Sequence, residues 1–213
     1  MAQVVSALKN VYPDAACALK WGGDDPWRLL VMGRLSAQCT DARVNLTAPE
    51  LFAAYPNAQA MANAALPELE RLIRPCGLYH RKALDLKLAS ERLVTVYGGE
   101  LPRETEQLLT FPGVGRKIAN LLRGDIWHYP AVVTDTHCIR ICGRLGFYPE
   151  REKNPYKIEK ILTALLERSE SSDFCHRIVL FGREYCRARQ PLCDACPLGT
   201  AGLCEKRNRA VRK

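Results

Sequence analysis

Hydrophobic residues recur at helical spacing along most of this chain. In residues 3–11, Val4, Val5, Leu8 and Val11 fall on one side of a helix. Similar one-sided patterns run through residues 26–35, 81–96, 104–109, 117–123, 136–145, 155–166 and 174–185. Alternation with a period of two is scarce, and only residues 130–133 are expected to be extended. The pattern therefore predicts an all-α fold.

Capping and turn residues divide these helices. Asp25 is expected to cap a helix whose first residue is Pro26, and Thr40 or Asp41 to cap the next one. Turn residues interrupt the chain at 55–57, 65–67, 75–77 and 97–99, so helices follow one another quickly. No repeat or low-complexity linker separates domains, so a second domain is expected to pack closely against the first.

The composition is that of a globular protein. Of 213 residues, 47% are hydrophobic and 25% are charged, which excludes a disordered or fibrous chain. The N-terminal stretch is amphipathic, and no run approaches the roughly 18 apolar residues of a membrane span, so we expect a soluble cytoplasmic protein. The net charge of +8 indicates a polyanionic partner, unless the basic charge serves solubility alone.

Residues 109–120 place a glycine-rich turn between two predicted helices. Pro112 has a fixed φ and no amide hydrogen, while Gly113 and Gly115 permit positive φ and leave no side chain in the way. Consecutive amides can then point outward and bind an anion, which would also meet the positive end of the second helix. The pattern is typical of a phosphate site, with a ligand-free interhelical turn as the alternative.

Lys117 lies just after this turn and Asp135 further along the chain, and both carry side chains that can take part in catalysis. Lys117 is a nucleophile only if its amine is neutral, and because a free lysine has a pKa of about 10.4, this needs desolvation or neighbouring cations such as Arg116. Otherwise Lys117 contacts phosphate. Asp135 opens a helix after an apolar run, so it is expected to be an N-cap. Its carboxylate could also accept a proton or stabilise a cation.

Four of the ten cysteines lie close together near the C-terminus. They are Cys186, Cys193, Cys196 and Cys204, with the spacing C-x6-C-x2-C-x7-C. Four thiolates in one irregular loop indicate either a tetrahedral zinc site or a [4Fe-4S] cluster. Zinc ribbons usually carry two C-x2-C pairs and this chain has one, so iron–sulfur is favoured over structural zinc. A fixed loop would present Arg187 and Arg189 to an anion. The other cysteines are expected to be buried.

Four ordered motifs resemble those of the endonuclease III family of DNA glycosylases, within the helix-hairpin-helix superfamily. Residues 109–120 resemble the family's hairpin, 133–137 its catalytic aspartate motif, 35–41 its early helix-end motif, and the four cysteines its cluster loop. The resemblance covers nearly the whole chain. It implies two helical domains flanking a DNA-binding groove: a six-helix domain at 19–129 with its hairpin at about 103–123, and a [4Fe-4S] domain formed by 1–18 and 130–213.

The resemblance also implies roles for individual residues. Lys117 matches the nucleophilic lysine and Asp135 the catalytic aspartate, while Gln38 and Leu78 match residues that fill the gap left by a flipped nucleotide. Otherwise Gln38 is a polar helix end and Leu78 a core leucine. The expected DNA contacts are completed by Pro112, Gly113, Val114, Gly115 and Arg116 of the hairpin, and by Arg187 and Arg189.

The implied activity is that of a bifunctional DNA glycosylase and AP lyase in base excision repair. Such an enzyme acts as a monomer on double-stranded DNA carrying oxidised pyrimidines or abasic sites, and in a bacterium it would be associated with the nucleoid. Lys117 would attack the sugar C1′, the base would leave, and the resulting Schiff base would lead to β-elimination. The hairpin would supply affinity without reading sequence.

The chain departs from the family pattern at two places. The last cysteine spacing is x7 where x5 is usual, and Ile118 stands where threonine is common. One alternative is the adenine glycosylase family, which shares the hairpin and the cluster but lacks a lysine at the position of Lys117. A second is a non-catalytic DNA-binding protein, against which the presence of both Lys117 and Asp135 argues.

Overall fold

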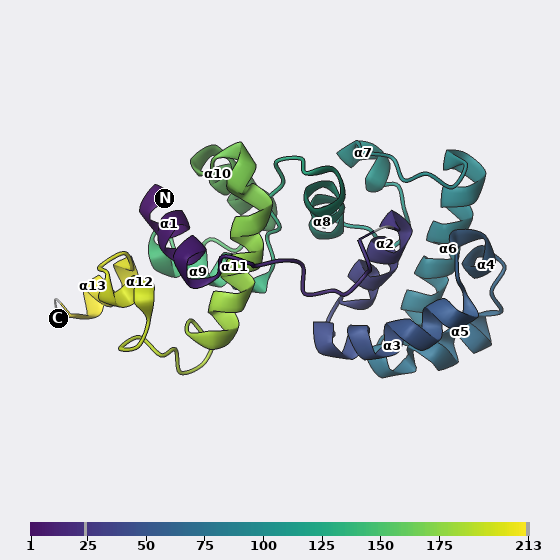
Figure 1. Ribbon diagram of the computed structural model, residues 1–213, viewed down its shortest axis with the longest axis horizontal. Helices are drawn as coiled ribbons and strands as arrows, with labels where there is room; N and C mark the ends of the chain where they lie inside the picture. Colours follow the sequence, from purple (N-terminus) through teal and green to yellow (C-terminus); the bar gives the residue numbers. More distant parts are fainter. Residues whose placement is uncertain (24, 212–213) are drawn as a thin grey trace. The chain divides into compact units, whose positions relative to one another are not determined.

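The computed structural model describes residues 1–23 and 25–211. Every regular element in that part of the chain is helical and no strand occurs there, so the predicted all-α fold is confirmed (Figure 1). Two compact units are present: Ala18–Trp127, called the hairpin unit below, and Met1–Cys17 with His128–Lys213, called the cysteine unit. These boundaries lie one residue and two residues from those expected at 18/19 and 129/130.

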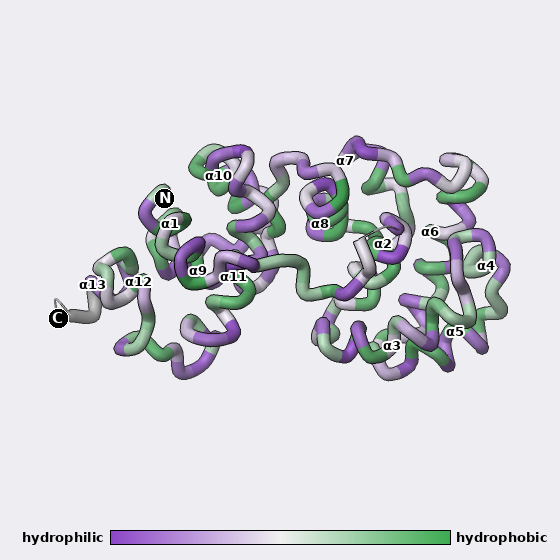
Figure 2. The backbone as a smooth tube through the Cα atoms, viewed as in Figure 1, coloured by the Kyte–Doolittle hydropathy of each residue, from purple (hydrophilic) through white to green (hydrophobic). Residues whose placement is uncertain are grey.

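The hairpin unit is assembled on its longest helix, α6 (Tyr79–Tyr97). Its other elements are α2 (Pro26–Leu35), α3 (Asp41–Ala54), α4 (Ala58–Ala62), α5 (Leu66–Ile73), the 3-10 turn η1 (Arg74–Cys76), α7 (Thr105–Leu108) and α8 (Arg116–Trp127). Helices α4 and α5 pack against α6, and α2 packs against both α6 and α8 (Figure 1). Hydrophobic and hydrophilic segments alternate along these helices, as expected when each buries one face (Figure 2).

Side-chain caps fix the starts of the predicted helices. The Asp25 carboxylate accepts a hydrogen bond from the Trp27 amide at 3.0 Å, and Pro26 occupies the first turn of α2, as expected. The Thr40 hydroxyl accepts from the Arg43 amide at 3.3 Å, so Thr40 rather than Asp41 caps α3. Such caps satisfy amides that have no partner within the helix.

The sequence pattern places Leu88 on the apolar face predicted for residues 81–96, but the buried face of α6 differs from that prediction. Lys82, Asp85 and Ser90 are at most 2% exposed, whereas Leu88 is 39% exposed. Each buried polar side chain has a partner; the Ser90 hydroxyl, for example, accepts a hydrogen bond from the Trp27 indole at 3.0 Å. Hydrophobic periodicity treats such residues as solvent-facing, which is why it missed them.

The cysteine unit centres on α11 (Ser171–Glu184). Its other elements are α1 (Ala2–Val11), α9 (Thr136–Leu145), α10 (Pro155–Leu165), the 3-10 turn η2 (Arg168–Glu170), α12 (Pro197–Thr200) and α13 (Glu205–Val211). Both α1 and α9 pack against α11. The buried Arg177 guanidinium of α11 joins η2 to the end of α1, since it lies 2.9 Å from Glu170 and donates to the Tyr12 carbonyl at 3.3 Å.

The segment expected to be extended, residues 130–133, is non-helical and forms no strand. Residues 131–134 are buried, and the Val133 amide lies 3.2 Å from the Cys175 sulfur. Of the remaining cysteines outside the C-terminal loop, Cys76, Cys138, Cys142 and Cys175 are buried, whereas Cys17 and Cys39 are partly exposed. Within residues 1–23 and 25–211, none of the helices has the length and apolar character needed to cross a membrane.

Candidate functional site

The predicted helix–turn–helix at residues 104–123 is present as α7, a turn at 109–115, and α8. Two apolar side chains anchor the turn: Phe111 is 2% exposed and Val114 is 6% exposed. The Phe111 ring stacks on Tyr97 with a centroid separation of 5.2 Å. The Val114 amide donates to the Phe111 carbonyl at 3.0 Å, which closes the turn. The turn is therefore a packed part of the unit.

The two glycines of the turn have different structural roles. Gly113 has a φ of +76°, and a Cβ there would lie 2.5 Å from Arg34 Nε and 2.9 Å from Asp85 Oδ2. Gly115 has no positive φ, and a Cβ there would meet nothing within 4 Å. Therefore the backbone conformation and the close packing require a glycine at position 113 but not at position 115. Gly115 instead leaves the backbone beside it open to a ligand.

The amides of the turn differ from the expected run of consecutive outward donors. The Val114 amide is used inside the turn, and Pro112 has no amide hydrogen. In the part of the chain that the structure describes, the amides of Gly113 and Gly115 donate no hydrogen bond. These two donors, together with the positive end of the α8 dipole, form an electropositive end suited to one phosphate.

A buried ion pair packs against the turn at Gly113. The Arg34 guanidinium lies 2.7 Å and 2.9 Å from Asp85 Oδ2 through Nη2 and Nε. Arg81 Nε lies 3.0 Å from the other oxygen of Asp85. The Arg34 and Asp85 side chains are only 13% and 3% exposed. Sequence reasoning missed both ion pairs of Asp85. Only the pair with Arg81 had a signal, its i, i+4 spacing on a predicted helix.

Lys117 lies in the first turn of α8 and is exposed. The next residue, Ile118, points inward and is 8% exposed. A Cβ on Gly33 of α2 would lie 3.4 Å from Ile118 Cγ2, so Ile118 fills the contact where α2 and α8 approach closely. The unusual isoleucine thus belongs to the packing under the hairpin, while the amine of Lys117 faces outward.

Asp135 caps α9, as predicted. Its Oδ1 accepts a hydrogen bond from the Cys138 amide at 2.7 Å, and its own amide donates to the Val133 carbonyl at 3.0 Å. The side chain is partly exposed. Because one oxygen is engaged at the helix end, the carboxylate has a fixed position and keeps its other oxygen for further contacts. Asp135 belongs to the cysteine unit and Lys117 to the hairpin unit.

Gln38 and Leu78 share an uncommon backbone conformation. Their φ angles are +53° and +48°, in the left-handed region that residues other than glycine seldom occupy. Gln38 is exposed, and Leu78 is 56% exposed, so Leu78 is not a core leucine. Strained positions of this kind cluster at functional sites.

The four C-terminal cysteines lie in the segment between α11 and α13, which includes the short helix α12. Cys196 is buried, Cys186 and Cys204 are partly exposed, and Cys193 is exposed. Burial raises the pKa of the Cys196 thiol. Among the described residues, no group of three or more His, Cys, Asp or Glu side chains forms a ready metal site.

The surroundings of the sulfurs are nevertheless suited to thiolates. The Gly199 amide donates to Cys196 Sγ at 3.3 Å, and Arg144 Nη1 donates to Cys186 Sγ at 3.4 Å. Hydrogen bonds of this kind stabilise negative charge on sulfur and are a feature of iron–sulfur sites. Two of the four sulfurs accept such a hydrogen bond, and a set of four soft donors fits an iron–sulfur cluster or zinc.

Arginines of α9 hold the beginning of the cysteine loop. Arg144 donates to the carbonyls of Arg187 and Ala188 at 2.7 Å and 3.1 Å, and Arg140 donates to the Cys186 carbonyl at 3.0 Å. The side chains of Arg187 and Arg189 are exposed. The backbone that carries these two guanidiniums is therefore fixed by protein contacts. Sequence reasoning missed Arg140 and Arg144, whose only signal was their i, i+4 spacing.

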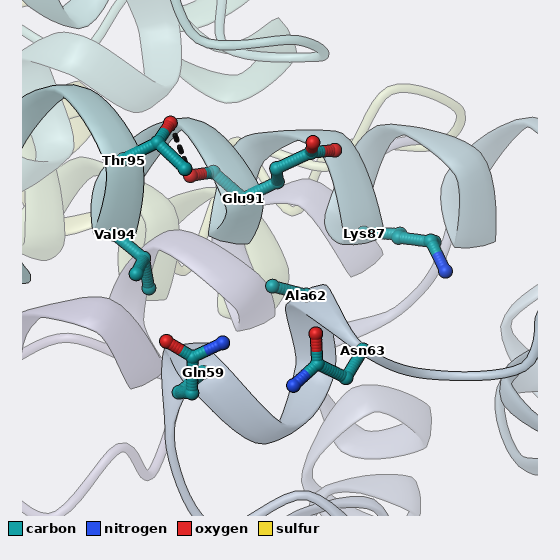
Figure 3. A pocket seen from close by; sticks show the side chains of 7 residues that line it. All are labelled: Gln59, Ala62, Asn63, Lys87, Glu91, Val94 and Thr95. Atoms are coloured by element: carbon teal, nitrogen blue, oxygen red, sulfur yellow. Dashed lines mark hydrogen bonds between the residues drawn. The ribbon is translucent and has the colours of Figure 1, made fainter.

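A cavity of about 450 Å³ lies between α4 and α6 (Figure 3). Gln59 and Asn63 line one side, and Lys87 and Glu91 line the other. None of the predicted site residues contributes to it, so this cavity is not part of the candidate site.

Known proteins resemble the chain along its whole length. Residues 31–168 match a family profile described as HhH-GPD superfamily base excision DNA repair protein. Endonuclease III of Synechocystis sp. is 40% identical over 203 residues, which span 95% of this chain and 90% of that protein. The structure of a non-covalent endonuclease III–DNA complex has a TM-score of 0.91 at 37% identity, covering 100% of this chain and 97% of that one.

A second solved structure, a trapped endonuclease III–DNA covalent intermediate, also has a TM-score of 0.91. Its identity is 36%, and it covers 99% of this chain and 97% of its own. These similarities extend over the hairpin, the aspartate motif and the cysteine loop together. The chain therefore belongs to the endonuclease III family, within the HhH-GPD superfamily of base excision DNA repair proteins.

Proposed function

We propose that this protein excises oxidised pyrimidines from double-stranded DNA with Lys117 as its nucleophile. As a member of the endonuclease III family, it is a DNA N-glycosylase and AP lyase of base excision repair that binds duplex DNA. The observation that carries the assignment of Lys117 is its position. Its exposed amine lies in the first turn of α8, directly after a turn that offers the Gly113 and Gly115 amides to a phosphate.

The reaction begins with attack of the neutral Lys117 amine on C1′ of the flipped nucleotide. The C1′–N bond to the base breaks, and its electron pair leaves with the base, which takes up a proton. The attached amine loses one proton, and the C1′–O4′ bond then opens with O4′ taking up a proton, which gives a protonated Schiff base between Nζ and C1′. This imine acidifies C2′, so loss of a C2′ proton expels the 3′ phosphate oxygen. Water then hydrolyses the imine and frees the lysine.

Asp135 is proposed to stabilise the positive charge that develops on the sugar. Its carboxylate is held at the N-terminus of α9 by the Cys138 amide, so it keeps one orientation during the reaction. The hairpin binds a backbone phosphate without reading sequence, as a search for damage requires. With chromosomal DNA as its substrate, the protein would be located with the nucleoid in a bacterial cytoplasm.

Gln38 and Leu78 are proposed to fill the gap that the flipped nucleotide leaves in the duplex. Their exposure and their left-handed backbone support this role, because a side chain must project from the surface to enter a base stack. Arg187 and Arg189 are proposed as further phosphate contacts, since both are exposed on a loop that Arg144 holds.

Cys186, Cys193, Cys196 and Cys204 are proposed to hold a [4Fe-4S] cluster, with structural zinc as the alternative. When bound, either group crosslinks the loop and leaves no coordination position for substrate. A purified [4Fe-4S] protein should be yellow-brown and contain iron and acid-labile sulfide. Cys196→Ser should lose that colour, whereas a colourless protein containing one zinc per chain would select the alternative.

Borohydride trapping tests the nucleophile. Native protein and Lys117→Ala are mixed with duplexes carrying thymine glycol or an abasic site, and Lys153→Ala serves as a control at an exposed lysine. Borohydride reduces the Schiff base to a stable protein–DNA adduct. Native protein and the control should be trapped on both duplexes and Lys117→Ala on neither. Equal trapping of Lys117→Ala would overturn the assignment, and trapping on the abasic duplex alone would overturn the proposed base specificity.

A further inference from the structure

Gln38 and Leu78 need a restraint that keeps them in the left-handed region. The penalty for this conformation arises from the Cβ atom, so an unrestrained segment would relax to another conformation. Both residues lie just beyond the end of a helical segment: Gln38 three residues after the last residue of α2, and Leu78 two residues after the last residue of η1. A restraint on these two ends would therefore act on both exposed side chains.

Lys82 contacts both of these helix ends. Its side chain is 0% exposed, and its ammonium donates to the Leu35 carbonyl at 2.8 Å and to the Cys76 carbonyl at 2.9 Å. Leu35 is the last residue of α2, and Cys76 is the last residue of η1. The Lys82 amide also donates to the Leu78 carbonyl, at 3.0 Å.

Burying an ammonium carries a desolvation cost that a contact serving only core packing would not require. Burial lowers the pKa of Lys82, while the nearby Cys39 and Cys76 sulfurs oppose that shift. An apolar side chain of similar length could fill the same volume without the desolvation cost. It could not, however, hold two carbonyls that belong to separate segments of the chain.

We infer that Lys82 is a positioning residue that crosslinks the α2 end to the η1 end and thereby fixes the spacing of Gln38 and Leu78. This inference rests on the proposed gap-filling role of these two residues. It extends that proposal, because it explains how two separate segments present their side chains together. Lys82 itself is too deeply buried to touch DNA.

Lys87 provides a matched control on the same helix. Its ammonium donates to the Ala64 carbonyl at 2.7 Å, just after α4, and its side chain lines the cavity between α4 and α6 (Figure 3). Methionine at position 87 therefore removes one positive charge and one lysine–carbonyl hydrogen bond, whereas methionine at position 82 removes one positive charge and two such bonds. The bond removed at position 87 contacts neither the Gln38 segment nor the Leu78 segment.

The experiment compares single-turnover excision of thymine glycol from a fully paired duplex and from an unpaired bubble. The full-length native protein, Lys82→Met, Lys87→Met, Gln38→Ala and Leu78→Ala are measured, and thermal unfolding is recorded for each. Flipping a base from an intact duplex carries an energetic cost that gap-filling residues offset, whereas a base in a bubble is already unpaired. We expect Lys82→Met to lower the duplex-to-bubble rate ratio at least about tenfold, as Gln38→Ala and Leu78→Ala do. Lys87→Met should leave the ratio unchanged.

A merely structural role for Lys82 would lower both rates equally. An unchanged ratio for Lys82→Met, alongside a reduced ratio for Gln38→Ala and Leu78→Ala, would overturn the inference and leave the gap-filling role intact. Unchanged ratios for Gln38→Ala and Leu78→Ala would instead refute the gap-filling role and the inference with it. If Lys82→Met does not fold, Lys82→Gln is measured in its place, and the same outcomes support or overturn the inference.

Discussion

Gly113→Ala should mainly lower the stability of the protein, whereas Gly115→Ala should mainly lower its affinity for DNA. The sequence alone does not distinguish the two glycines. At Gly113 a methyl group enters a backbone with a φ of +76°, which costs an L-residue about 1–2 kcal/mol. The same methyl group would lie 2.5 Å from Arg34 Nε, and displacing the packed Arg34–Asp85 pair adds about 1–3 kcal/mol. Gly113→Ala should therefore destabilise the protein by about 2–5 kcal/mol.

At Gly115 the methyl group meets nothing within 4 Å, so only the less favourable N-cap of α8 weighs against alanine. That cost is about 1 kcal/mol or less. The methyl group nevertheless covers the backbone that faces the proposed phosphate, so DNA affinity should fall several-fold. Urea unfolding gives the two free energies, and fluorescence anisotropy with a duplex at fixed salt gives the two affinities. Equal destabilisation by both changes, or native affinity in Gly115→Ala, would contradict this account of the turn.

Two further predictions concern the cysteine unit. Asp135→Asn should keep the cap of α9 and native stability, whereas Asp135→Ala should lower the free energy of unfolding by about 1 kcal/mol. Both variants should lose excision activity. An active Asp135→Asn would refute the catalytic role. Hydrogen bonds from Lys9 and Arg177 hold the pKa of Glu170 below its usual value, so the carboxylate stabilises the fold above about pH 4.5. This contribution is lost as pH falls through the lowered pKa. Glu170→Gln should accordingly cost about 1 kcal/mol at pH 7 and progressively less as the pH falls below about 4.5, measured by urea unfolding. A cost independent of pH would show that the charge is not involved.

The local parts of the fold could be predicted because local signals specify them. Asp25, Thr40 and Asp135 are good N-caps, and each caps the helix that follows it. The hairpin was predictable in the same way, from helix formers on either side of a Pro–Gly turn. The four cysteines stood out through their spacing alone.

The supporting contacts could not be predicted because they join residues distant in sequence. Lys82 and Asp85 look like solvent-facing residues of an amphipathic helix, yet both are buried by partners that lie 47 and 51 positions away. The difference between Gly113 and Gly115 depends on Arg34, which packs against only one of them. The outward run of amides was expected from the proline and the two glycines of the turn, but the Val114 amide closes the turn instead. Tertiary packing decides each of these features.

The site of the covalent adduct is the most direct test of the proposed chemistry. Native protein is trapped on an abasic duplex with borohydride, the DNA is digested, and the protein is cleaved into peptides for mass spectrometry. The reduced sugar remnant should be found on Lys117 alone. A remnant on another lysine or on the N-terminal amine would show that the amine beside the hairpin is not the nucleophile.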